Sequence, residues 1–200
     1  MNDKLPPLSG IFGVPSHKDS ALGKALAILF EPSPTLISRL EPQLALLQQS
    51  PSSYSELIDT ALATITGWDT SAQSDFIAGH PRIGESKNLS NLSAKEQSGT
   101  GISPTPPEVL ARLAHLNACY EAKYPGLRYI TFVNGRPRHA IAEELEDLLG
   151  FNHSLLADEP ALIGIESMDI TGDLWRGELR RAIEDIGLIA KSRLVALGVE

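Results

Sequence analysis

Residues 106–124, PPEVLARLAHLNACYEAKY, carry the clearest helical pattern of the chain. Two prolines occupy the first turn, where a helix does not need their missing amide donors. Apolar side chains then recur at spacings of four, three and four residues, at Val109, Leu113, Leu116 and Tyr120. Pro125 and Gly126 end the pattern. A helix with such a stripe must bury it against other elements, so this stretch predicts a fold of packed helices.

Further helices are predicted on both sides of this stretch. They cover residues 20–30, 35–49 with an early interruption at Pro42, 53–66, 70–78, 93–99, 137–149 and 173–197. Only residues 129–133 have strand-like side chains, and they have no partner, so we expect an extended segment packed on helices. The sequence therefore predicts an all-α, single-domain bundle of seven to nine helices. The domain covers 20–200 after an arm at 1–19, with an insertion-like connection at 150–172.

Composition limits the classes of function. The 200 residues are 42% hydrophobic, enough for one sizeable core, and the net charge of -8 argues against nucleic acid and anionic membranes as partners. One cysteine excludes an internal disulfide and favours a reducing compartment. The sequence has no membrane span, no secretory signal and no C-terminal Ser-Lys-Leu peroxisomal signal. We expect a cytoplasmic protein, with a peroxisomal location left open.

His80 is the first candidate for chemistry. It follows the predicted helix 70–78, for which Thr70 or Ser71 is the expected N-cap, and Pro81 fixes it in an extended conformation just past the helix end. An imidazole can donate or accept a proton near neutral pH, and general acid–base catalysis needs such a group in a fixed position. The ordinary alternative is a histidine that satisfies helix carbonyls and the helix dipole.

Ser93, Glu96 and Gln97 form a second candidate group. Ser93 and Glu96 have the spacing of a capping box, which predicts that Ser93 begins a short helix. Backbone donors at such a helix start suit an anionic or ureido-rich ligand. The alternative is that Glu96 serves only as an ordinary cap.

Arg193 falls on the apolar stripe of the last helix, three, four and seven residues after Ala190, Ile189 and Ile186. A buried guanidinium needs compensation, either from a fixed acidic side chain or from a substrate carboxylate. Both readings stay open, and the other arginines of this helix compete for the second: Arg176, Arg180 and Arg181. His115, His139 and His153 lack the spacing of a metal site, and the sequence contains no phosphate-binding loop and no serine-hydrolase motif.

Four motifs together resemble those of the OHCU decarboxylase family, which acts on 2-oxo-4-hydroxy-4-carboxy-5-ureidoimidazoline (OHCU) in urate degradation. They are His80-Pro81-Arg82-Ile83-Gly84-Glu85, Ser93-x-x-Glu96-Gln97-Ser98-Gly99, Leu116-Asn117-x-x-Tyr120-x-x-Lys123-Tyr124 and Tyr129-Ile130-x-Phe132-Val133-x-Gly135-Arg136. Their order and spacing match over roughly 20–150, and the last helix around Arg193 is also similar.

This resemblance implies a homodimeric, all-helical lyase of purine metabolism that uses neither a metal nor an organic cofactor and converts OHCU to S-allantoin. It implies that His80 and Glu96 are catalytic. The residues that it implies contact the small-molecule substrate are Pro81, Ser93, Gln97, Thr131, Phe132 and Arg193.

The chain departs from the family pattern at 150–172, which is longer than the family's connection to the last helix. The position of Arg193 in the site is therefore inferred across an insertion. Two alternatives remain: a related helical enzyme that acts on another ureido-carboxylate, and a non-catalytic helical binding module.

Overall fold

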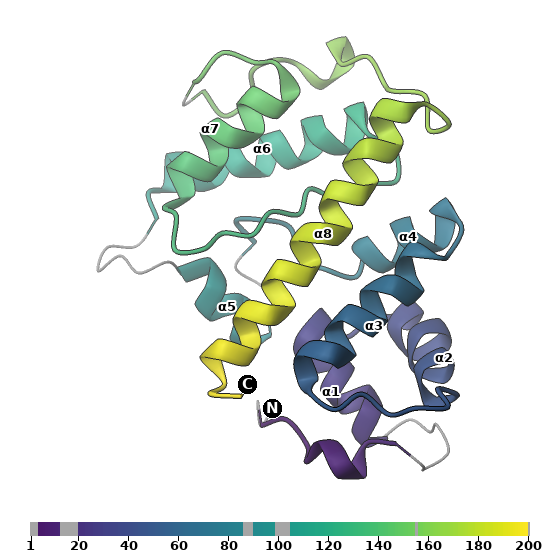
Figure 1. Ribbon diagram of the computed structural model, residues 1–200. Coiled ribbons are helices and arrows are strands. Elements are labelled where there is room, and N and C mark those ends of the chain that lie inside the picture. Colours follow the sequence, from purple (N-terminus) through teal and green to yellow (C-terminus); the bar gives the residue numbers. More distant parts are fainter. Residues whose placement is uncertain (1–3, 13–19, 86–89, 99–104, 155, 200) are drawn as a thin grey trace. The chain divides into compact units, whose positions relative to one another are not determined.

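The computed structural model describes residues 4–12, 20–85, 90–98, 105–154 and 156–199, without the side chains of 95–98. Within these ranges the chain forms eight α-helices and no strand, so the predicted all-α fold is confirmed. The chain divides into two compact units, Met1–His80 with Leu179–Glu200, and Pro81–Glu178 (Figure 1). The predicted limits of a single domain over 20–200 stay a prediction.

The helices agree closely with the predicted ranges. The first unit holds α1 (Ala21–Phe30), α2 (Glu41–Ala45), α3 (Tyr54–Thr66) and α4 (Thr70–Ile77), with a short 3-10 turn at Leu8–Gly10 and most of α8 (Asp173–Ala196). The second unit holds α5 (Asn91–Ser98), α6 (Pro107–Lys123), α7 (Arg138–Leu149), a 3-10 turn at Leu162–Gly164 and the first residues of α8. No helix in the described ranges is long and apolar enough to cross a membrane.

Side-chain caps begin α1, α3 and α4 of the first unit. Ser20 accepts a hydrogen bond from the Gly23 amide, and Ser53 accepts one from the Glu56 amide. Helix α4 is capped by Asp69, not by Thr70 or Ser71 as the sequence suggests. An aspartate satisfies the first amides and also suits the positive end of the helix dipole.

Pro42 has a different effect from the predicted interruption. A proline cannot donate to the carbonyl four residues earlier, and its ring would collide with that carbonyl. The preceding residues, Leu36–Leu40, form a wide π-helical turn in which the Glu41 amide reaches the Leu36 carbonyl. The helix therefore continues through Pro42 and ends at Ala45.

The first unit has an apolar core with an aromatic centre. Phe76 packs edge-to-face against Phe30 and Trp68, with ring centroids 6.1 Å apart in both pairs. Part of the N-terminal arm contributes, because Leu5 and Ile11 are buried. This core lies around the end of α4 and therefore supports the residues that follow it.

The second unit is built on α6 and α7, which lie side by side (Figure 1). A buried ion pair joins them, with the Arg112 Nη2 and Glu146 Oε1 atoms 2.6 Å apart. Residues 127–133 run without regular secondary structure, as predicted, and the Tyr129 ring packs against that of Tyr120 at 5.4 Å.

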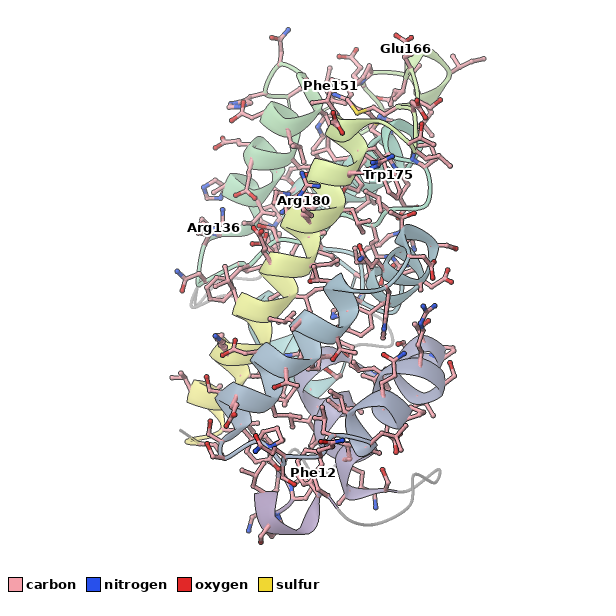
Figure 2. The ribbon with its side chains drawn as sticks, turned by 45° about the vertical axis from the view of Figure 1, so that its right-hand side comes forward. Phe12, Arg136, Phe151, Glu166, Trp175 and Arg180 are labelled. Atoms are coloured by element: carbon pink, nitrogen blue, oxygen red, sulfur yellow. The ribbon has the colours of Figure 1, made fainter. Side chains whose placement is uncertain are left out.

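The connection at 150–172 is attached to the second unit mainly through its own backbone. Arg112 Nη1 donates to the carbonyls of Leu156, at 2.8 Å, and of Glu159. His115 Nε2 lies 2.9 Å from the Pro160 carbonyl, and the Met168 amide donates to the Lys123 carbonyl. Phe151 and Glu166 belong to this connection, and Trp175 follows it in α8 (Figure 2).

Candidate functional site

His80 lies just past the end of α4, as predicted. Its amide donates to the Ile77 carbonyl at 3.0 Å, which closes the last turn, and Pro81 prevents any continuation of the helix. The preceding residue has to be glycine. A Cβ atom on Gly79 would lie 2.4 Å from the Cβ atom of Ser33, well inside contact distance. The turn after α1 and the turn before His80 therefore press directly against each other.

The His80 ring is buried, with 5% of the residue exposed. It packs edge-to-face on Phe76 with centroids 5.6 Å apart. Burial lowers the pKa of His80 to about 4, and the positive charge of Arg193 acts in the same direction. The Glu31 carboxylate and two helix carbonyls oppose this shift but do not reverse it. At neutral pH the imidazole is therefore uncharged and can accept a proton.

Arg193 is buried on the stripe of α8, as its spacing predicts, with 2% of the residue exposed. Its Nη2 atom donates to Glu31 Oε1 at 2.6 Å, and Nη1 donates to the carbonyls of Ile28 and Leu29 at 3.0 and 3.3 Å. Of the two readings that the sequence leaves open, the fixed acidic partner is therefore present. A role for Arg193 in holding a substrate carboxylate stays a prediction.

The other arginines of α8 have different surroundings. Arg176 and Arg180 are exposed, and Arg181 forms an ion pair with Asp185 at 2.8 Å. Arg193 is the arginine of this helix whose charge acts on His80.

Glu31 is a residue of this cluster that the sequence analysis missed. In the sequence, the stretch Glu31-Pro32-Ser33-Pro34 indicates only the end of a helix. A signal was present, because an acidic residue at the C-terminal end of a helix faces the negative end of the dipole and needs a cation nearby. Glu31 is 5% exposed, and that cation is Arg193.

Helix α5 begins earlier than predicted, and the prediction that Ser93 caps it is wrong. The cap is Ser90, whose Oγ accepts the Ser93 amide at 3.1 Å while its carbonyl accepts the Ala94 amide. The additional residues at the start of the helix include Leu92 and Ser93, and both are buried. Ser90 and Ser93 have the same capping chemistry, so the burial of this segment decides which of them caps the helix. Glu96 and Gln97 follow Ser93 by one turn in α5, but their side chains lie outside the described residues.

Thr131 and Phe132 lie together on the extended segment, held by Glu144 of α7. Glu144 Oε1 accepts hydrogen bonds from Tyr129 at 2.6 Å and from Thr131 at 2.8 Å, and its Oε2 pairs with Arg136. Arg136, which is labelled in Figure 2, also donates to the Phe132 carbonyl at 2.6 Å. Partial burial raises the pKa of Glu144, but the hydrogen bonds from its partners outweigh that effect and lower it. The carboxylate therefore stays charged and fixes the segment.

The predicted site residues are thus distributed over both units. The first unit brings His80 and Arg193 together with Glu31, and the second brings Thr131 and Phe132 together through Glu144. Pro81, half-buried, and Ser93 also belong to the second unit. Among the residues whose side chains are described, no cluster of histidine, cysteine, aspartate and glutamate has the arrangement of a metal site.

Comparison with known proteins agrees with these motifs. The sequence model of one family, described as OHCU decarboxylase, matches residues 15–154. The match includes His80, Ser93, Glu96, Gln97, Thr131 and Phe132, and it ends before α8 and Arg193. A search of curated proteins found no match. Because the family match covers more than half of the sequence, the chain belongs to the OHCU decarboxylase family, whose name denotes a decarboxylase of urate degradation.

Proposed function

We propose that this protein decarboxylates OHCU to S-allantoin, with His80 managing the proton. The observation that carries the proposal is a buried, uncharged histidine at a fixed helix end, next to a buried Arg193–Glu31 pair, in a chain of this family. A histidine whose pKa is shifted this far by burial and by a nearby charge is a candidate functional residue.

The chemistry suits an enzyme that positions the substrate and moves one proton. When the bond from the ring carbon to the carboxylate breaks, carbon dioxide leaves and the electron pair moves toward the adjacent carbon–nitrogen double bond. The substrate therefore provides its own electron acceptor. What remains for the protein is orientation of the leaving carboxylate and transfer of a proton, contributions of a few kcal/mol or more each.

His80 is assigned the role of proton acceptor. The low pKa of about 4 means that the imidazole starts neutral. In this assignment it takes the proton of the substrate hydroxyl as that group becomes a carbonyl. The protonated ring then returns a proton to the neighbouring ring carbon, and water supplies the proton for the ring nitrogen that received the electron pair. Delivery to one face of the ring gives a single enantiomer.

The remaining roles follow the family positions. Arg193 provides the cation for the leaving carboxylate, and Glu96 is the second catalytic group, which bonds the ureido or ring nitrogens. Pro81, Ser93, Gln97, Thr131 and Phe132 contact the rest of the substrate. Because Glu144 and Arg136 already engage the Thr131 hydroxyl, the backbone is the part of this segment that we expect to meet the substrate. The homodimer stays a prediction.

The test is circular dichroism of the allantoin formed from freshly generated OHCU, with wild type, His80→Asn and Glu96→Gln. We expect fast, S-selective product from wild type and slow, racemic product from both variants. His153→Ala is the matched control, because this exposed histidine pairs with Asp147 at the surface and should not affect the product. Slow racemic product from folded wild type would refute the proposal and leave the alternatives of another ureido-carboxylate substrate or a binding module.

A further inference from the structure

Glu31 combines three unfavourable features. It directly follows the last residue of α1, where the helix dipole repels a negative charge. Its φ of 66° is positive, and residues other than glycine seldom adopt a positive φ. Its carboxylate is buried, with 6% of the side chain exposed. Nothing in the termination of α1 needs a glutamate, because Pro32 already stops the helix.

Arg193 compensates the two electrostatic features, the negative end of the helix dipole and the buried carboxylate. Its guanidinium donates to Glu31 Oε1 and to the carbonyls of Ile28 and Leu29, so consecutive parts of one helix end hold it from several directions. A planar guanidinium with acceptors fixed in this way cannot rotate without losing a hydrogen bond. Its position relative to the rest of the first unit is therefore set by the end of α1.

His80 lies against this same helix end. The backbone of Gly79 lies so close to Ser33 that there is no space for a side chain on Gly79. Ser33 is two residues after Glu31. The charges of Arg193 and Glu31 act on His80 in opposite directions. If Glu31 were removed, the buried positive charge of Arg193 would act on the imidazole with no negative charge to balance it. The guanidinium would also lose its 2.6 Å hydrogen bond to Glu31.

We propose that Glu31 is a positioning residue that fixes the Arg193 guanidinium beside His80 and balances its charge. Glu31 does not touch the substrate in this arrangement and acts through Arg193. The catalytic consequence rests on the proposed function, whereas the anchoring of Arg193 does not.

The first measurement is kinetic. Glu31→Gln keeps the size and one acceptor oxygen but removes the charge. We expect kcat to fall about tenfold or more, because small misplacements of a group that acts in the transition state are costly, with KM changed far less. Glu31→Asp keeps the charge with a shorter reach, so its kcat should lie between those of wild type and Glu31→Gln. Wild-type kcat in both variants would overturn the proposal.

The matched control is Glu146→Gln. Glu146 and Arg112 form an ion pair with the same separation of 2.6 Å and similar burial, but in the second unit. This variant should lose stability to a similar degree and keep its kcat once folded. An equal loss of kcat in both variants would show that Glu31 contributes only to folding, and would overturn the positioning role.

The second measurement needs no activity. In ¹H–¹⁵N spectra, a guanidinium held by several acceptors gives separate Nη signals, which Arg193→Lys identifies by their loss. These signals should merge in Glu31→Gln and persist in Glu146→Gln. Separate signals in Glu31→Gln would refute the anchoring even if wild type proved not to decarboxylate OHCU. If Glu31→Gln does not fold, Glu31→Asp carries both measurements.

Discussion

Replacement of Gly79 by alanine tests the close approach that holds His80 in place. The added Cβ atom would lie 2.4 Å from the Ser33 Cβ atom. Carbon atoms in contact prefer about 3.5–4.0 Å, so one segment has to move by roughly 1 Å or more. Overpacking of this kind costs about 1–3 kcal/mol. For a chain of this size, that lowers the Tm by roughly 2–12 °C. A shift of about 1 Å at His80 should also reduce kcat by up to about a hundredfold.

The assay combines thermal unfolding with S-allantoin formation in Gly79→Ala, Ser33→Gly and the double variant. Ser33→Gly removes the opposing Cβ and loses a cap on the Leu36 amide, so alone it should cost a few tenths of a kcal/mol. The double variant should recover both Tm and kcat relative to Gly79→Ala. Gly67→Ala is the control, because its Cβ would meet only ordinary contacts in a helical conformation. The reasoning is refuted if Gly79→Ala behaves like Gly67→Ala, or if Ser33→Gly brings no recovery.

Four other variants test separate features. The buried His80 has a folded pKa of about 4 against about 6.5 unfolded. Its contribution to stability is therefore complete above pH 6.5 and is lost, on the order of 3 kcal/mol, as the pH falls to 4. Urea unfolding at pH 7 and 4.5 should show a smaller loss in His80→Gln than in wild type. Arg112→Met should cost about 3–5 kcal/mol, because it leaves the Glu146 charge buried, and an added Glu146→Leu should recover most of it. Glu144→Gln should cost about 1 kcal/mol at pH 7, measured by chemical unfolding, and the difference from wild type should shrink in acid as the wild-type carboxylate protonates. Ser90→Ala should cost about 1 kcal/mol and speed hydrogen exchange in α5, and unchanged exchange would contradict the assignment of the cap.

Features that depend on neighbours in sequence could be predicted. Helix α6, the extended segment without a strand partner and the place of His80 after α4 follow from local spacing, caps and prolines. The burial of Arg193 follows from the stripe of α8. These predictions hold because each rests on the geometry of a single element.

Features that depend on partners distant in sequence were missed. Glu31 and Arg193 are 162 positions apart, so neither the charge of one nor the stripe of the other identifies the pair. The choice of Ser90 over Ser93 depends on the burial of Leu92, which local capping rules do not contain. In the sequence, a distant contact of this kind shows only as an unfavourable feature that the local structure does not explain. At Glu31 that feature is an acidic residue at the C-terminal end of a helix.

The attachment of the 150–172 connection has a consequence for how this chain can change. Arg112, His115 and Lys123 meet the connection through the carbonyls of Leu156, Glu159 and Pro160 and the amide of Met168. Every residue type has a carbonyl, and all but proline have an amide, so these four contacts do not depend on which side chains the connection displays. The exposed Leu162 and Ile163 can therefore be exchanged while the path of the backbone is kept. The connection is a place where new surface chemistry can be introduced, by evolution or by design, without altering the helices that hold it.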